Sequence, residues 1–227
     1  VVSHAKTLGY IPNSARAPIA NVNVTLNNIG GLTSATIPVG TIFTTSIDDV
    51  NYQFVTVAEH TALKVNGVLS FSNIPIYEGT YVTNRYTVDT DNVDQKFYVN
   101  DENGDTSTLL VDVFNTASST SSTTFTQALD NTQVKANSDV YYLQESVDGK
   151  FEVYFGDGVT GKALSDGNIV RLRYVVTNKT KANGASSFTT SATISGITDI
   201  TTATVSSASG GAEKESIESI KFNAPLD

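Results

Sequence analysis

The sequence predicts a mainly β (α+β) protein, with antiparallel sheets in sandwich- or barrel-like packing and short flanking helices. Short runs rich in β-branched and aromatic residues recur along most of the chain, and several alternate polar and apolar residues with the period of a half-buried strand. Dipeptides of Gly with Gly, Asn or Asp separate these runs, as tight turns between strands require. Patterns with a helical period are scarce.

The first 20 residues differ in pattern from the rest of the chain, and we expect a short helical leader over residues 1–20. A short helix fits His4 to Tyr10, and Pro12 breaks it because proline lacks the N–H that a helix interior needs. Polar and apolar residues then alternate from Asn21 to Leu26, which predicts the first half-buried strand.

The clearest predicted hairpin joins residues 141–147 to residues 150–155. Both runs are rich in aromatic and apolar residues, and Asp148-Gly149 between them tolerates the positive φ of a tight turn. Further strands are expected at 95–99, paired with 108–113, and at 169–176.

Two tracts are dominated by Ser and Thr, residues 115–126 and residues 189–209. We expect a loop or an edge strand in the first tract, and a strand in the second because Thr favours sheets and isoleucines recur there. The β-rich region spans 21–192, as one region or as two subdomains (21–114 and 127–192) joined by the Ser/Thr-rich stretch.

Residues 193–227 are expected to form a strand or linker and then the start of a helix that leads to a following domain. The helix is predicted over Glu213 to Phe222, because acids near its start and Lys221 near its end suit the helix dipole, and Pro225 ends it. Its apolar surface is too small to fold alone. We therefore expect inter-domain contacts from three helix residues, Ile217, Ile220 and Phe222.

The composition excludes several classes of function. The chain has 227 residues and a formal charge of −9, from 23 acidic and 14 basic residues, without a basic cluster. Such a surface repels phosphate, so we expect neither nucleic acid nor a membrane as partner. The absence of Cys excludes disulfides, cysteine nucleophiles and thiolate zinc sites. No apolar run approaches the roughly 20 residues of a membrane-spanning helix.

Residues 156–162 match the spacing of a nucleotide-binding P-loop, G-x-x-x-x-G-K. Ala163 occupies the position at which a P-loop carries the Ser or Thr that holds Mg²⁺, and the residues after it favour a turn over a helix. Asp157 also places a negative charge where a phosphate would bind. We interpret the segment as a glycine-rich turn and expect no cofactor and no small-molecule substrate.

Other candidate residues give no recognisable site. One acidic stretch comprises Asp89, Asp91, Asp94, Asp101 and Asp105. Its spacing does not match an EF-hand, so two interpretations remain: an irregular calcium site, or acidic loop residues that are simply solvated. The only histidines, His4 and His60, lie in no catalytic motif. We therefore predict no catalytic, cofactor-binding or metal-binding residues, and no enzyme.

Several segments, in order and spacing, resemble one family over nearly the whole chain. They are Ile37 to Thr41 with the strand ending at Thr56, Phe151 to Gly161, Gly167 to Val170, Asn183 to Ala185, and Ser209 to Pro225. Together they resemble the baseplate J-like family, and within it the inner-ring wedge subunits of T-even-type phage baseplates. Lys221 stands where many members carry Arg.

The resemblance implies a structural component of a contractile phage tail baseplate, carried in the virion and assembled in the host cytoplasm. Family members pack as subunit pairs around the central hub, join other wedge proteins and rearrange when the sheath contracts. The expected partners are thus other baseplate wedge subunits and copies of the chain itself. The resemblance also implies that this chain is an internal piece of a longer protein, and it transfers no catalytic residue.

Two other classes of function fit parts of the pattern. An extracellular β-sandwich binding module, an adhesin or a carbohydrate-binding domain, shares the Ser/Thr-rich strands and the acidic charge. An enzyme domain using Asp or Glu would require a deep pocket in which two carboxyl groups have strongly perturbed pKa values.

Overall fold

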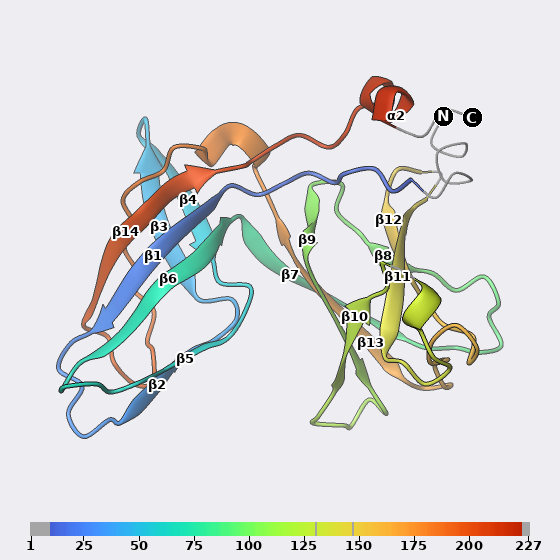
Figure 1. Cartoon of the computed structure of the whole chain (residues 1–227), viewed down its shortest axis with the longest axis horizontal. Coiled ribbons are helices and arrows are strands. Elements are labelled where there is room, and N and C mark those ends of the chain that lie inside the picture. Colours follow the sequence, from blue (N-terminus) through green and yellow to red (C-terminus); the bar gives the residue numbers. More distant parts are fainter. Residues whose placement is uncertain (1–9, 130, 147, 224–227) are drawn as a thin grey trace. The chain divides into compact units, whose positions relative to one another are not determined.

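The computed structural model describes residues 10–129, 131–146 and 148–223, and it confirms the predicted fold class (Figure 1). Strands dominate the described residues and form mostly antiparallel pairs, whereas β10 (Thr123–Gln127) and β11 (Val140–Glu145) pair in parallel. The described helices are α2 (Ile217–Asn223) and two short 3₁₀ turns, Asn131–Gln133 and Lys179–Ala182. The helix expected at residues 4–10 lies almost entirely outside the described residues.

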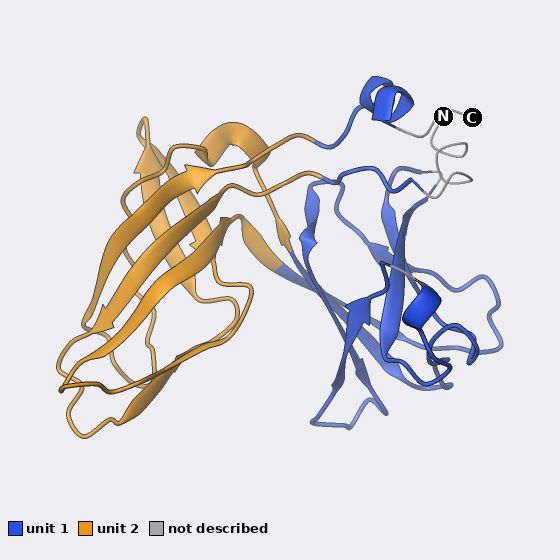
Figure 2. Cartoon of the chain, in the orientation of Figure 1, with its two compact units in different colours: residues 1–14, 82–174, 214–227 blue, residues 15–81, 175–213 orange. Residues whose placement is uncertain are grey.

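The chain forms two compact units, each built from separate stretches of sequence (Figure 2). Unit 1 comprises residues 1–14, 82–174 and 214–227, and unit 2 comprises residues 15–81 and 175–213. The chain therefore passes between the units four times. The separate folding of residues 21–114 and 127–192 stays a prediction.

Unit 2 contains a five-stranded antiparallel sheet in the order β14-β1-β6-β4-β3 and a two-stranded sheet of β2 and β5. Their bounds are β1 Ile19–Leu26, β2 Ser34–Ile37, β3 Ile42–Ile47, β4 Val50–Val55, β5 His60–Leu63, β6 Leu69–Glu78 and β14 Ile200–Ser209. The strand predicted at residues 21–26 is confirmed as β1, with Val22, Val24 and Leu26 all buried. The strand predicted in the second Ser/Thr-rich tract is confirmed at β14.

The open side of the five-stranded sheet is closed by residues 184–189. At one end the backbone of Ala208 in β14 exchanges hydrogen bonds with Gly184 and Ala185. At the other end Thr189 and Thr44 in β3 donate to each other's carbonyl oxygens, at 3.0 and 2.8 Å. Both edges of the sheet therefore have backbone partners in this segment, and its Ala185 and Phe188 side chains join the buried apolar cluster of unit 2.

Unit 1 contains the seven-stranded sheet, in the order β7-β13-β9-β10-β11-β12-β8. Its remaining strands are β7 Thr80–Thr87, β8 Phe97–Val99, β9 Gly104–Phe114, β12 Phe151–Phe155 and β13 Ile169–Val176. The two edge strands face each other: the Tyr86 hydroxyl in β7 donates to the Tyr98 carbonyl in β8 at 2.8 Å, and the Tyr86 and Phe97 rings lie 5.6 Å apart. The sheet is thus a nearly closed barrel.

The hairpin predicted at residues 141–155 is confirmed, with Tyr141 opposite Phe155 and Glu145 opposite Phe151. The predicted pairing of residues 95–99 with 108–113 is wrong, because β8 pairs with β12 while β9 lies between β13 and β10. The Phe97 ring packs edge-on against Phe155 of β12, at 5.6 Å, and this contact favours the observed partner.

The first Ser/Thr-rich tract ends in a central strand, so the expected loop or edge is wrong for residues 123–126. β10 lies between β9 and β11. Its Phe125 is buried, with its ring 5.4 Å from that of Phe155. One aromatic side chain among threonines therefore holds this segment in the interior of the sheet.

Candidate interaction surfaces

The helix predicted over residues 213–222 is shorter than expected, since α2 begins at Ile217. Tertiary contacts hold the residues before it in a non-helical conformation. The Glu215 N–H donates to the Asn13 carbonyl oxygen at 3.0 Å, a partner outside any helix. Glu213 pairs instead with Lys179, at 2.6 Å. These contacts replace the first turn that the acids had suggested.

Lys214 fixes this segment to the β11–β12 hairpin. Its ammonium lies 2.5 Å from Oε1 of Glu145, a side chain that is 5% exposed, and it also donates to the Gly149 carbonyl. The same ammonium stands 5.3 Å from the centre of the Phe151 ring. A buried carboxylate, a carbonyl and an aromatic face together compensate the desolvation of the cation.

Glu215 ties α2 to the N-terminal stretch of the chain. Its carboxylate accepts hydrogen bonds from the Tyr10 hydroxyl at 2.7 Å and the Asn13 N–H at 2.9 Å. It also accepts from Ser219 at 3.1 Å and Asn223 at 3.0 Å, both within the helix segment. No local pattern in the sequence predicts this anchor, because Tyr10 and Asn13 lie more than 200 positions away.

The hydrogen bonds to Glu215 make the anchor sensitive to acid. Burial raises the pKa of the Glu215 carboxyl, but the donors outweigh it and lower the pKa from 4.5 to about 2. A depressed pKa stabilises the folded state fully above about pH 4.5, and this contribution is lost as the pH falls towards about 2. We therefore expect amide exchange in α2 to accelerate over that range.

The measurement is amide hydrogen exchange of residues 217–223 at a series of pH values, compared with Glu215→Gln. After correction for intrinsic exchange rates, the difference in protection between the two proteins should shrink as the pH falls through this window. A difference that is constant from neutral to acidic pH would contradict the anchor.

The three helix residues expected to contact a neighbouring domain differ in exposure. Ile220 is buried, at 2% exposed. Ile217 is 57% exposed and Phe222 is 87% exposed. Two large apolar side chains therefore face solvent on a helix that is firmly anchored, and the contact with another domain stays a prediction.

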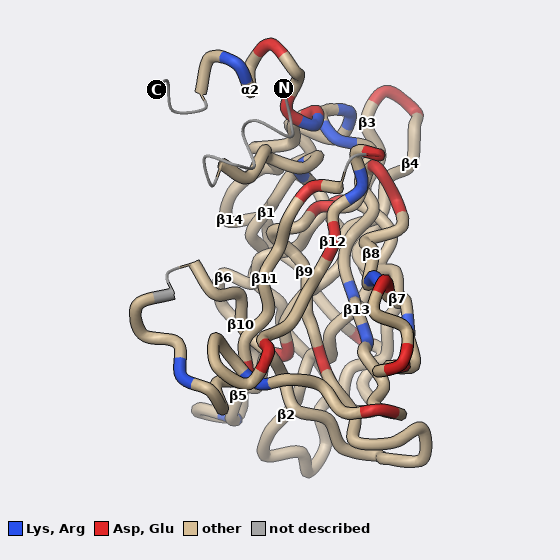
Figure 3. The backbone as a smooth tube through the Cα atoms, turned by 90° about the vertical axis from the view of Figure 1, so that its right-hand side faces the viewer, with Lys and Arg blue, Asp and Glu red and all other residues tan. Residues whose placement is uncertain are grey.

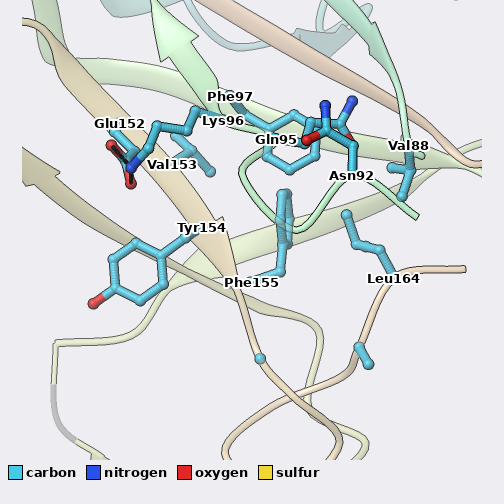
Figure 4. A pocket seen from close by; sticks show the side chains of 12 residues that line it. Val88, Asn92, Gln95, Lys96, Phe97, Glu152, Val153, Tyr154, Phe155 and Leu164 are labelled. Carbon is cyan, nitrogen blue, oxygen red and sulfur yellow. Dashed lines mark hydrogen bonds and ion pairs between the residues drawn. The ribbon is translucent and has the colours of Figure 1, made fainter. Parts of the chain in front are cut away.

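A cavity of about 280 Å³ opens in unit 1 beside β8 and β12 (Figure 4). Its apolar lining includes Phe97, Phe155 and Leu164, and Lys96 lies on its polar side, 3.1 Å from Glu152. The Glu152 carboxylate raises the pKa of Lys96 by hydrogen bond and by charge. Among the described lining residues Glu152 is the one carboxylate, so the two neighbouring carboxyl groups that an enzyme domain using Asp or Glu would require are not found in this cavity.

The glycine-rich segment at residues 156–162 is a turn, as the sequence predicts. The Asp157 carboxylate accepts the N–H groups of Val159 and Thr160, both at 2.9 Å. Lys162 pairs with Asp139 at 3.2 Å, and no helix follows in residues 163–168. The lysine and the loop backbone are thus engaged within the protein.

The acidic stretch and the histidines form no cluster in the part of the chain that the structure describes. Asp89 and Asp101 each accept a backbone N–H two residues further on, the common pattern of an Asx turn. Among the described residues, no group of three or more His, Asp or Glu is placed so that it could hold a metal ion. Burial lowers the pKa of His60, and His4 lies outside the described part of the chain.

Comparison with known proteins places the chain among phage baseplate components. Residues 82–200 match a family model described as bacteriophage baseplate wedge protein gp6, third domain. Baseplate wedge protein gp6 of Enterobacteria phage T4 is 25% identical over 248 aligned positions, which cover 97% of this chain and 36% of the relative. The chain thus spans about a third of that relative's length. No described helix has the length and apolar character needed to cross a membrane.

Proposed function

Because the chain belongs to the bacteriophage baseplate wedge protein gp6 third-domain family, we propose that it is a structural part of the wedge of a contractile phage tail baseplate. The observation that carries the proposal is the match over residues 82–200, which include most of unit 1 and part of unit 2. The resemblance stated from the sequence is to the same wedge proteins, and it is confirmed.

We propose that the chain acts by packing against other wedge subunits and copies of itself, and that these contacts rearrange on sheath contraction. Its hydrogen-bonded sheets support this role, since bending a sheet breaks many backbone hydrogen bonds at once. In this proposal the chain performs no chemistry of its own. Reproducible substrate turnover that disappears when one acidic side chain is replaced would contradict that part.

We further propose that α2 carries one of these contacts through Ile217 and Phe222. The exposed apolar area of these two residues supports the proposal, because exposed aromatic and aliphatic side chains on a rigid element are common anchors of interfaces. Ile220 then serves to hold the helix in place, since it is already buried.

Replacing both exposed residues, Ile217→Ser with Phe222→Ser, should reduce assembly without unfolding the chain. In the virus that encodes the chain, we expect the yield of complete tails to fall at least about tenfold, because removing an interface anchor costs about 2 kcal/mol. Electron microscopy of particle counts measures the yield. The matched control is Leu129→Ser, which removes a side chain that is equally exposed, at 87%, elsewhere in unit 1. Equal yields from the double variant and the control would reject this role of α2.

A further inference from the structure

Three of the four arginines in this acidic chain lie together on the outer face of the seven-stranded sheet in unit 1. Arg171 and Arg173 alternate along β13 with the buried residues Val170, Leu172 and Tyr174, so both point away from the barrel interior. Arg85 lies on the neighbouring strand β7, between two half-buried residues. Figure 3 shows basic residues on both strands.

One buried carboxylate sits at the centre of this arginine face, which we define as Arg85, Arg171, Arg173, Asp112 and Phe114. Asp112 Oδ2 accepts from Arg171 and from Arg173, both at 2.8 Å, and its side chain is 3% exposed. Burial raises the pKa of Asp112, but the hydrogen bonds from Arg171 and Thr124 and the two positive charges outweigh it, so its pKa is lowered. The carboxylate is therefore ionised and holds both guanidinium groups in place.

Phe114 orders two of the guanidinium groups. The centre of its ring lies 5.1 Å from Cζ of Arg85 and 4.9 Å from Cζ of Arg171. Guanidinium groups favour the faces of aromatic rings, and such contacts fix the direction of their N–H donors. The arginine face is thus preorganised, with little side-chain freedom to lose on binding.

The arginine face has more positive charge than its own carboxylate can balance. Asp112 pairs with Arg171 and Arg173, whereas Arg85 lies over the Phe114 ring, and none of the described carboxylates forms an ion pair with the exposed Arg85. Nε of Arg173 is buried and has no hydrogen-bond partner in the described structure. The local excess is two positive charges, in a chain whose formal charge is −9.

We propose that the arginine face is a docking site for a carboxylate side chain on an acidic segment of another protein. The proposal rests on the proposed function and adds the chemistry of one contact to it. Arg85 offers a planar pair of donors that matches the two oxygens of Asp or Glu. A nucleic-acid backbone is the less suitable ligand, since it would bring many phosphates against a chain whose formal charge is −9.

The test is fluorescence anisotropy of the full 227-residue chain with labelled peptides at low ionic strength. One peptide alternates Glu and Gly, and the matched peptide carries Gln in place of Glu. We expect the Glu peptide to bind at least about tenfold more tightly than the Gln peptide. Arg85→Gln should remove most of this preference, whereas Lys135→Gln, which removes the same charge from another exposed site in unit 1, should change it less than about twofold.

Arg85→Lys separates recognition by shape from attraction by charge alone. It keeps the charge but loses the planar pair of donors, so binding of the Glu peptide should be clearly weaker than in the unaltered chain. Each variant should keep the thermal unfolding midpoint of the unaltered chain, because Arg85 is exposed and its replacement leaves the fold intact.

Three results would overturn the docking site. They are equal affinities for the two peptides, an Arg85→Gln variant that behaves like Lys135→Gln, and tighter binding of a single-stranded DNA oligomer than of the Glu peptide. Failure of this test would leave the proposed wedge role standing if α2 variants still reduce the yield of tails, because the two experiments use different surfaces.

Discussion

Replacing Glu78 with Ala is expected to lower the free energy of unfolding by about 3–5 kcal/mol. Glu78 is the last residue of β6 in unit 2, and its side chain is almost completely buried. Its carboxylate accepts three hydrogen bonds, from the Thr177 hydroxyl at 2.7 Å and from the backbone N–H and side-chain amide of Asn178 at 2.8 and 2.7 Å. Alanine would remove the acceptor that these three donors share, and a hydrogen bond to a charged group contributes about 1.5–3 kcal/mol. The loss is largest at the buried Thr177 hydroxyl and smaller at Asn178, which is exposed and can bond to water instead.

Urea unfolding of the variant and the unaltered chain measures this loss. Glu78→Gln should cost less, about 1–3 kcal/mol, because the amide keeps one acceptor oxygen but sets its NH₂ group against a donor. Glu59→Ala removes an exposed carboxylate of the same unit and should stay within about 0.5 kcal/mol. If Glu78→Ala costs no more than Glu59→Ala, the three hydrogen bonds are not a significant source of stability.

The role of Glu78 illustrates what the sequence can and cannot reveal. Its strand β6 alternates buried and more exposed residues, a pattern that is local in the sequence, but its partners Thr177 and Asn178 lie about 100 positions along the chain. The same limit applies to the anchor of α2, in which Glu215 accepts hydrogen bonds from the distant residues Tyr10 and Asn13. A local pattern reports which face of a strand is buried, and it does not report which distant polar group will satisfy a buried charge.

Strand positions are more predictable than strand partners. The hairpin at residues 141–155 follows from a turn dipeptide between two apolar runs, because the short connection leaves one favourable pairing. The partner of residues 97–99 was predicted wrongly because these residues form an edge strand of the nearly closed barrel. Their observed partner β12 is set by how the whole sheet closes, which a local pattern does not report. The division of unit 1 and unit 2 among separate stretches of chain follows from the same long-range pairing.

The arginine face shows a related gap between residues and site. Arg171 and Arg173 are recognisable in the sequence as the outward positions of a strand. Arg85 and Asp112 join them only because β7 and β9 flank β13 in the sheet. The family resemblance indicates the function without the structure, since it rests on order and spacing over the whole chain and does not depend on any single site.

Gly156→Ala is expected to cost about 3 kcal/mol, at the upper end of typical overpacking. A Cβ atom at Gly156 would lie 2.3 Å from both the carbonyl carbon and the oxygen of Gly161, and 2.5 Å from its Cα. All three atoms belong to the backbone, so no side chain can rotate away and the loop itself must move. The glycines that imitate a phosphate-binding motif are therefore required by a close approach of two backbone segments.

Two other glycines serve as controls in the same urea measurement. Gly158 has a φ of +86° but no atom within 4 Å of the position that a Cβ would occupy, so Gly158→Ala should cost about 1–2 kcal/mol from backbone conformation alone. Gly31 has neither a positive φ nor a close neighbour, and Gly31→Ala should stay within about 0.5 kcal/mol. If Gly156→Ala lowered the free energy of unfolding no more than Gly31→Ala does, the backbone of Gly161 would not lie as close to Gly156 as the structure shows. A loss of stability in the expected order would establish that the close packing of Gly156 against Gly161 requires a glycine at position 156.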